Sequence, residues 1–277
     1  MTINCRGQLL DLSTPKVMGI LNATPNSFYD GGRFQKETEI LNQVAKMLEE
    51  GATFIDLGVY SSKPNADFVS EAEEISRMLP IVKLLQQHFP EALLSMDTFR
   101  SEVAKVALDH GAALINDISA GNLDKQMLAT IASYQVPYIM MHMKGTPQTM
   151  ATLTQYDAIV KEMLFYFSER VAEARSHGIN DLLLDPGYGF AKTINQNYEV
   201  LQHMELFQFL ELPLLVGVSR KSMVHQVLHS TAQEALNGTT VLNTLALTKG
   251  ANILRVHDVK EAAECIRLFD KMNSIKS

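Results

Sequence analysis

Apolar and polar positions along this chain form a unit that recurs from end to end. Each unit is a short apolar run, a polar or glycine-rich turn, and then an amphipathic segment. Eight such runs are present, at residues 17–21, 54–57, 93–96, 113–115, 138–141, 182–184, 214–218 and 253–256. Parallel strands that are covered by helices are apolar on both faces, so these runs predict buried parallel strands.

The segments between the runs have the periodicity of helices. One apolar stripe consists of Ile40, Val44, Met47 and Leu48, a second of Ile75, Met78, Leu79, Val82 and Leu85, and a third of Val259, Ala263, Ile266 and Phe269. The second stripe follows Ser70 and Glu73, a pair typical of a capping box at a helix N-terminus. Strands therefore alternate with amphipathic helices along the whole chain.

Eight β/α units favour a (β/α)₈ barrel, and 277 residues is close to the usual length of one such barrel. Residues 3–12, around Arg6 and Gly7, are predicted to form an N-terminal β-hairpin that plugs the barrel floor. An open doubly wound sheet would show the same alternation, but no G-x-G-x-x-G motif follows the first run. We therefore expect a single domain that spans residues 1–277.

Composition narrows the class of protein. The net charge of −7 makes a general nucleic-acid-binding surface improbable, because such a surface needs a concentrated basic face. No apolar run approaches the roughly 18 residues that span a bilayer, and residues 1–12 do not resemble a signal peptide. Cys5 and Cys265 lack metal-like spacing and are expected to be reduced thiols. These features predict a cytoplasmic protein that binds neither nucleic acid nor membrane.

Every predicted strand delivers a polar side chain at or just after its carboxyl end. These residues are Asn22, Asp56, Asp97, Asn116 with Asp117, His142, Asp185, Ser219 with Arg220 and Lys221, and Arg255 with His257. Any one of them could be a turn former or a helix cap, and for Asp56 and Asp117 that alternative is as good as a functional role. All eight strands together instead predict an active site, because barrel enzymes carry theirs at this end.

The polar residues divide into two chemical halves. Asp97, Asn116 and Asp185 suit the polar edge of a flat heterocycle, because a carboxylate can accept two parallel N–H bonds. Lys221, Arg255 and His257 form a cationic half, and we expect Asn22 to face them across the barrel mouth. The loops after the last two strands are the usual phosphate site of this fold. A heterocycle joined to phosphate is predicted, and nucleotides and pterins both satisfy this description.

The loops themselves resemble those of the dihydropteroate synthases. Seven matching segments occur in family order, at residues 18–32, 95–98, 115–118, 141–147, 184–190, 217–223 and 255–259. Together they cover nearly the whole chain. The resemblance implies a transferase of folate biosynthesis that condenses hydroxymethyl-dihydropterin diphosphate with p-aminobenzoate. It also implies a homodimer, Mg²⁺ as cofactor, and sensitivity to sulfonamides, which occupy the aminobenzoate slot.

The resemblance further implies roles for individual residues. Pterin would be bound by Asp97, Asn116, Asp185 and Lys221. Diphosphate would be bound by Asn22, Lys63, Arg255 and His257, with Asn22 acting through Mg²⁺. The aminobenzoate would lie against Ser62, Pro64, Phe190, Lys221 and Ser222. Asp30, Lys221, Arg255 and His257 would be the catalytic residues, with Asp30 on the first loop stabilising a pterin cation.

Two loops depart from the family pattern and keep two alternatives open. Asn26 replaces an aspartate, and Val59, Lys63 and Asn65 replace glycine, arginine and glycine. Lysine cannot reproduce the bidentate fork of arginine, so a weakly active or non-catalytic pterin-binding paralogue is one alternative. The other is a methyltetrahydrofolate-binding methyltransferase barrel. Such an enzyme has no need of a diphosphate cluster, so residues 219–222 and 255–257 argue against it.

Overall fold

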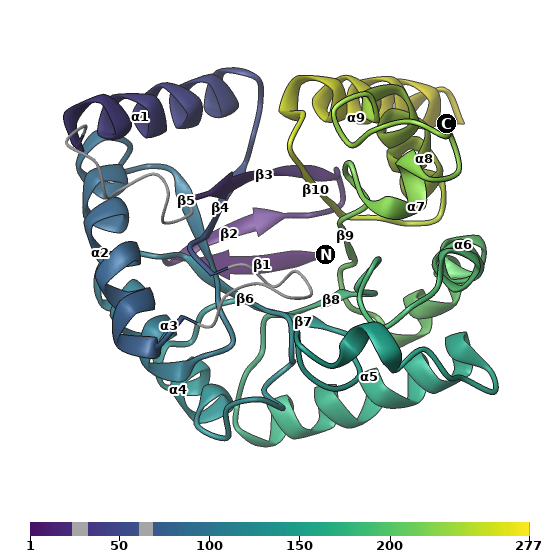
Figure 1. Cartoon of the computed structure of the whole chain (residues 1–277), viewed down its shortest axis with the longest axis horizontal. Coiled ribbons are helices and arrows are strands. Elements are labelled where there is room, and N and C mark those ends of the chain that lie inside the picture. The colour runs from purple at the N-terminus through teal and green to yellow at the C-terminus, as the bar shows by residue number, and fades with distance from the viewer. Residues whose placement is uncertain (24–32, 61–68, 277) are drawn as a thin grey trace.

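The computed structural model describes residues 1–23, 33–60 and 69–276. Within these residues, eight parallel strands form one sheet in the order β8-β7-β6-β5-β4-β3-β10-β9, and helices surround it (Figure 1). The strands are β3 (Lys16–Asn22), β4 (Phe54–Gly58), β5 (Leu93–Asp97), β6 (Leu114–Asp117), β7 (Tyr138–Met141), β8 (Leu182–Asp185), β9 (Leu215–Val216) and β10 (Ile253–Val256). The sheet closes where Leu184 pairs with Leu214 and its N–H donates to the Pro213 carbonyl oxygen at 2.9 Å. The predicted (β/α)₈ barrel is confirmed.

The helices follow the strands as the apolar stripes predict. They are α1 (Arg33–Glu49), α2 (Glu71–His88), α3 (Ser101–Asp109), α4 (Met127–Tyr134), α5 (Ile159–Ser176), α6 (Ile194–Gln202), α7 (Ser222–His225), α8 (Leu236–Thr248) and α9 (Val259–Asn273). Short 3₁₀ helices lie at η2 (Met150–Thr152), η3 (Met204–Leu210) and η4 (Ser274–Lys276). At α2 only half of the predicted capping box forms. Ser70 Oγ accepts from the Glu73 N–H at 3.3 Å, whereas the Glu73 carboxylate is paired with Arg77.

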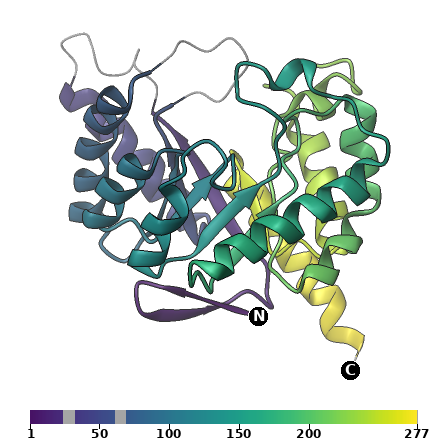
Figure 2. The ribbon, with the colours of Figure 1, turned by 90° about the horizontal axis from the view of Figure 1, so that it is seen from below.

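The N-terminal hairpin covers one end of the barrel (Figure 2). It consists of β1 (Thr2–Cys5) and β2 (Gln8–Asp11), which pair antiparallel through a two-residue turn. Arg6 and Gly7 both have positive φ, at 54° and 81°, which is the backbone of a type I′ turn. Ile3, Cys5 and Leu12 belong to the same buried cluster as the first inward-facing residues of the strands. The hairpin therefore plugs the barrel floor, as predicted.

Strand alternation changes the barrel interior from apolar to polar along its length. The inward residues nearest the floor are apolar: Met18, Phe54, Leu93, Leu114, Ile139, Leu183, Leu215 and Ile253. Two residues further along the same faces lie Asp56, Ser95, Asn116, Asp185 and Arg255. Successive inward side chains are two residues apart, so this polar layer stands directly above the apolar floor. The fold thus places the polar side chains at the carboxyl ends of the strands.

In the parts of the chain that the structure describes, none of the helices has both the length and the apolar character that crossing a membrane would require.

Candidate active site

A cavity of about 610 Å³ opens at the carboxyl ends of the strands. Nine of the predicted site residues line it: Asn22, Asp97, Asn116, Asp185, Phe190, Lys221, Ser222, Arg255 and His257. Four others, Asp30, Ser62, Lys63 and Pro64, lie outside the described residues. The barrel therefore brings together residues that are up to 235 positions apart in the sequence, from Asn22 to His257.

Backbone register sets the neighbours within the cavity. Asn22 pairs with Gly58, Gly58 with Asp97, and Asp97 with Asn116, so these residues form one row across four adjacent strands. A Cβ atom at Gly58 would lie 3.5 Å from Asn22 Oδ1 and 3.7 Å from Asp97 Oδ2. The predicted position of Asn22 across the mouth from the cationic residues is wrong. Its strand, β3, is hydrogen-bonded directly to β10, the strand of Arg255.

Arg255 joins the two chemical halves that the sequence predicts to be separate. Its Nε donates to Asp56 Oδ2 at 2.6 Å, and its Nη2 donates to Asp97 Oδ2 at 2.9 Å. Burial opposes the charged form of Arg255, but the two carboxylates outweigh it and raise its pKa further. The division into an acidic half and a cationic half is therefore wrong for this residue, because inward side chains of β4, β5 and β10 meet inside the barrel.

Asp56 is a buried hub rather than a turn former or a helix cap. Besides Arg255, it accepts a hydrogen bond from Ser95 Oγ at 2.5 Å and from Asn116 Nδ2 at 3.2 Å. The sequence signal that identifies it is strand alternation, because Phe54, two positions earlier, faces the barrel interior.

Asp117 is a turn former, the alternative that the sequence offers beside a functional role. Its carboxylate accepts from the N–H groups of Ser119 and Gly121 at 2.7 and 2.8 Å, and from Tyr138 Oη at 2.5 Å. It is a turn former on the outward face of β6, between the sheet and the helices. The structural alternative that the sequence left open for Asp117 is therefore confirmed.

Asp185, the last residue of β8, and Lys221, which follows β9, lie at the carboxyl ends of two adjacent segments of the barrel. Asp185 Oδ1 accepts from the Gly187 N–H at 2.7 Å, and burial raises its pKa while nearby Lys221 opposes the shift. Lys221 Nζ donates to the Tyr188 carbonyl oxygen at 2.5 Å and lies 5.0 Å from the centre of the Phe190 ring. Burial lowers the pKa of Lys221 to about 8, against the effect of Asp185. Lys221 thus connects an acidic wall of the cavity with an aromatic one.

His257 is neutral at pH 7, which corrects its predicted place among the cations. Burial, together with the nearby Arg255 charge, lowers its pKa to about 4. Its ring Nδ1 lies 3.0 Å from Ser219 Oγ, and the backbone N–H of His257 donates to the same oxygen at 3.1 Å. Ser219 therefore fixes the ring at the cavity wall.

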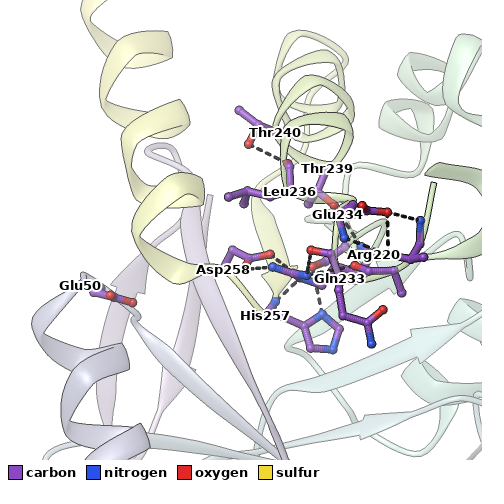
Figure 3. Close-up of polar contacts among 12 residues, drawn as sticks. Glu50, Arg220, Gln233, Glu234, Leu236, Thr239, Thr240, His257 and Asp258 are labelled. Atoms are coloured by element: carbon purple, nitrogen blue, oxygen red, sulfur yellow. Dashed lines mark hydrogen bonds and ion pairs between the residues drawn. The ribbon is translucent and has the colours of Figure 1, made fainter. Parts of the chain in front are cut away.

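Arg220 anchors the loop that carries Lys221 and Ser222 (Figure 3). Its Nε and Nη2 form a bidentate pair with Asp258 at 2.8 and 2.7 Å, and its Nη1 donates to the Ala232 and Gln233 carbonyl oxygens. The backbone of Arg220 has a φ of 55°, an unfavourable value for a side-chain-bearing residue. The ion pair holds this loop against the one that begins α9.

His142 follows β7 but does not line this cavity. It is buried, and its Nδ1 is 3.0 Å from Lys192 Nζ. Lining residues that the sequence did not single out include Gly217, His225 and Gln233. Of these three, only Gly217 could have been identified as a lining residue from the sequence, because it lies at an inward position of the seventh apolar run.

The comparisons with known proteins agree with this site. Residues 18–257 match the family described as "Pterin binding enzyme". The Escherichia coli (strain K12) dihydropteroate synthase is 41% identical, over 100% of this chain and 98% of that protein. A Yersinia pestis dihydropteroate synthase crystallised as a sulfonamide drug complex is also 41% identical, with a TM-score of 0.92 over 99% of this chain and 100% of that one. A Xanthomonas albilineans dihydropteroate synthase with 4-aminobenzoic acid is 33% identical, with a TM-score of 0.90 over 99% of this chain and 98% of that one.

This chain, a closed β/α barrel with a polar mouth, is thus a pterin-binding enzyme. Within that class, the chain belongs to the dihydropteroate synthase family, the transferases of folate biosynthesis.

Proposed function

We propose that this enzyme condenses hydroxymethyl-dihydropterin diphosphate with p-aminobenzoate to give dihydropteroate and diphosphate. The observation that carries the proposal is the row of acceptors Asp97 and Asn116 on β5 and β6, with Asp185 on β8, lining one cavity with Lys221 and Arg255. An amino-pyrimidinone edge presents several N–H donors, which match these oxygens. Lys221 and Arg255 supply the positive charge that an anionic leaving group requires.

The pterin ring fits between Asp97, Asn116 and Asp185, with Lys221 above its edge. Arg255 is already bound to Asp97 and Asp56, so it holds the acidic wall as well as facing the leaving group. When the C–O bond to diphosphate breaks, the pterin carries positive charge that Asp97 and Asp185 stabilise. The aniline nitrogen of p-aminobenzoate then donates its electron pair to the carbon that the diphosphate has left. A new C–N bond forms, and the nitrogen loses a proton.

Diphosphate would be bound by Arg255, His257, Asn22 and Lys63. His257 is neutral in the free enzyme, so it would donate through its ring N–H unless the incoming anion draws a proton onto it. Such protonation would itself tighten the grip on diphosphate.

Mg²⁺ fits this site as a cation that is coordinated by both the protein and the substrate. Among the described residues, no group of three acidic, histidine or cysteine side chains could hold a metal by itself. Mg²⁺ commonly takes only one or two protein oxygens and fills the rest of its sphere with phosphates and water. Asn22, exposed at the mouth with Gly58 leaving space beside its Oδ1, is suited to be that protein ligand. A bound Mg²⁺ would neutralise charge on the departing diphosphate.

The aminobenzoate would lie against Phe190, Lys221 and Ser222, with Ser62 and Pro64 contributed by the second loop. Lys221 Nζ lies 5.0 Å from the centre of the Phe190 ring, so one aromatic ring and one ammonium group are presented together. That pairing suits a benzoate, which has an aromatic ring and a carboxylate.

We further propose a cytoplasmic homodimer. Val241 and Leu245 are exposed one turn apart on α8, Leu268 and Met272 are exposed one turn apart on α9, and Ile275 is exposed on η4, which follows α9. Helices α8 and α9 pack against each other, so their exposed apolar residues lie on one side of the barrel. Exposed apolar residues on adjacent elements of this kind are typical of an interface between subunits.

A steady-state assay with the pterin diphosphate and p-aminobenzoate, with and without Mg²⁺, tests the proposed function. Diphosphate release that depends on both substrates supports it. Pterin binding without turnover would instead indicate the non-catalytic paralogue, and turnover restored by Lys63→Arg with Asn65→Gly would place the defect in the second loop.

A further inference from the structure

Lys192 is buried behind the aromatic wall of the active site and belongs to none of the roles above. Its Nζ lies 3.0 Å from His142 Nδ1, 3.0 Å from the Gly187 carbonyl oxygen, 3.1 Å from the Phe190 carbonyl oxygen and 3.4 Å from the His142 carbonyl oxygen. All four partners are neutral, and the side chain is 8% exposed. Burying an ammonium group among neutral acceptors is costly, so this arrangement needs an explanation.

The geometry suits the charged form of the lysine. An ammonium group has three N–H donors, and three acceptors lie within 3.1 Å of Nζ. His142 can accept at Nδ1 because burial, together with the charge on Lys192, lowers its pKa to about 2 and keeps it neutral. Burial lowers the pKa of Lys192 to about 7, and Asp185 opposes that shift.

Lys192 and Lys221 both donate hydrogen bonds to the turn at residues 187–190. Lys192 binds the carbonyl oxygens of Gly187 and Phe190, while Lys221 binds the carbonyl oxygen of Tyr188 between them. The Gly189 N–H donates to Asn197 Oδ1 at 2.7 Å. The backbone of residues 187–190 is therefore fixed at each step by a partner outside the turn.

The turn also packs tightly on the end of β7. Gly187 has a φ of 68°, and a Cβ atom there would collide with the His142 carbonyl oxygen. Lys192 Nζ contacts both His142 and Gly187, so it joins the two backbones at this close approach. The direction in which Phe190 leaves the turn depends on that junction.

We propose that Lys192 is a positioning residue for the p-aminobenzoate part of the site, acting through Phe190 and the Lys221 contact to Tyr188. This inference rests on the proposed function, in which Phe190 and Lys221 receive the aminobenzoate. Without Lys192, three acceptors inside the fold lose their donor, and the turn relaxes away from β7. Phe190 then moves relative to Lys221, whereas Asp97 and Asn116, on β5 and β6, keep their places.

The test replaces Lys192 by Met, which keeps the length of the side chain and removes its donors. Lys249→Met is the matched control, because Lys249 also donates to a carbonyl oxygen, that of Gln202, but lies outside the cavity. We expect Lys192→Met to raise the KM for p-aminobenzoate about tenfold, because Phe190 moves by less than the roughly 1 Å misplacement that can cost about 10²-fold. The Kd for the pterin diphosphate and the values for Lys249→Met should stay unchanged. Lys192→Gln, which retains two donors, should give an intermediate KM.

Two results would overturn the inference. One is an unchanged aminobenzoate KM in an active, folded Lys192→Met enzyme. The other is a parallel loss of kcat, aminobenzoate affinity and pterin affinity in proportion to lost stability, which indicates a structural role alone. The NMR signal of a labelled Phe190 ring provides a readout independent of activity. It should shift in Lys192→Met and Lys192→Gln but not in Lys249→Met, even if the chain proves inactive and the proposed function fails.

Discussion

Arg255 Nε donates to Asp56 Oδ2 at 2.6 Å, although the two residues are 199 positions apart and their strands are separated by β3. The same guanidinium group reaches Asp97 on β5. One cation is therefore shared between two carboxylates inside the barrel. The charge that a ligand meets in this cavity is a property of the network and not of any single residue.

Asp56→Asn is expected to lower the free energy of unfolding by roughly 3 kcal/mol, because it leaves a buried cation with half of its partners. Urea denaturation measures this change. Ser95→Ala is the matched control, since it removes one hydrogen bond from an uncharged donor to the same carboxylate and should cost about 1.5 kcal/mol. Equal losses in the two variants would show that the Arg255 pair does not stabilise the fold.

Arg255→Ala is expected to slow cleavage of the pterin diphosphate by about 10²–10³-fold, the usual effect of removing one preorganised charge donor. Single-turnover release of diphosphate measures this step. Arg255→Lys keeps the charge but cannot bind Asp56 and Asp97 with a planar fork, so it should recover only part of the rate. An unchanged cleavage rate in Arg255→Ala would mean that the leaving group is bound elsewhere.

Asp185→Asn is expected to weaken pterin binding by roughly 2–3 kcal/mol, because the amide presents an N–H to a donor edge and leaves buried groups unpaired. The fold should survive, since an asparagine oxygen can still accept from the Gly187 N–H. Calorimetry with the pterin substrate, alongside circular dichroism, separates the two effects. Near-normal affinity would remove Asp185 from the pterin site.

Pterin affinity is expected to rise with pH near neutrality because of Asp97. Burial raises the pKa of Asp97 to about 7, against the effect of Arg255. The group is an anionic acceptor only above its pKa, so binding that requires the anion strengthens as pH increases from about 6 to 8. Calorimetric titrations with the pterin substrate over this range should show the trend in the native enzyme and a weaker trend in Asp97→Asn. Both proteins are titrated with the same ligand, so protonation of the ligand itself affects both equally. Identical pH profiles for the two proteins would contradict an ionised Asp97 in the site.

The amino-acid sequence by itself determined the barrel, the hairpin and the end of the barrel that carries the site. These depend on local patterns: apolar runs, helical stripes, and the position of a polar residue at the end of a strand. The same alternation could also have identified Asp56, since it has the inward parity of Phe54.

Only the tertiary structure decided which polar residues contact one another and what charge they carry. The sequence groups Arg255 with the anion site, and barrel closure also places it on Asp56 and Asp97. The sequence predicts a cationic His257, whereas burial with Arg255 nearby lowers its pKa to about 4. Lys192 carried no signal at all, because its acceptors are backbone carbonyl oxygens and a histidine ring from β7 and the following turn. Pairing and ionisation depend on distances and burial across strands that are remote in sequence, and strand and helix periodicity carry no information about those distances.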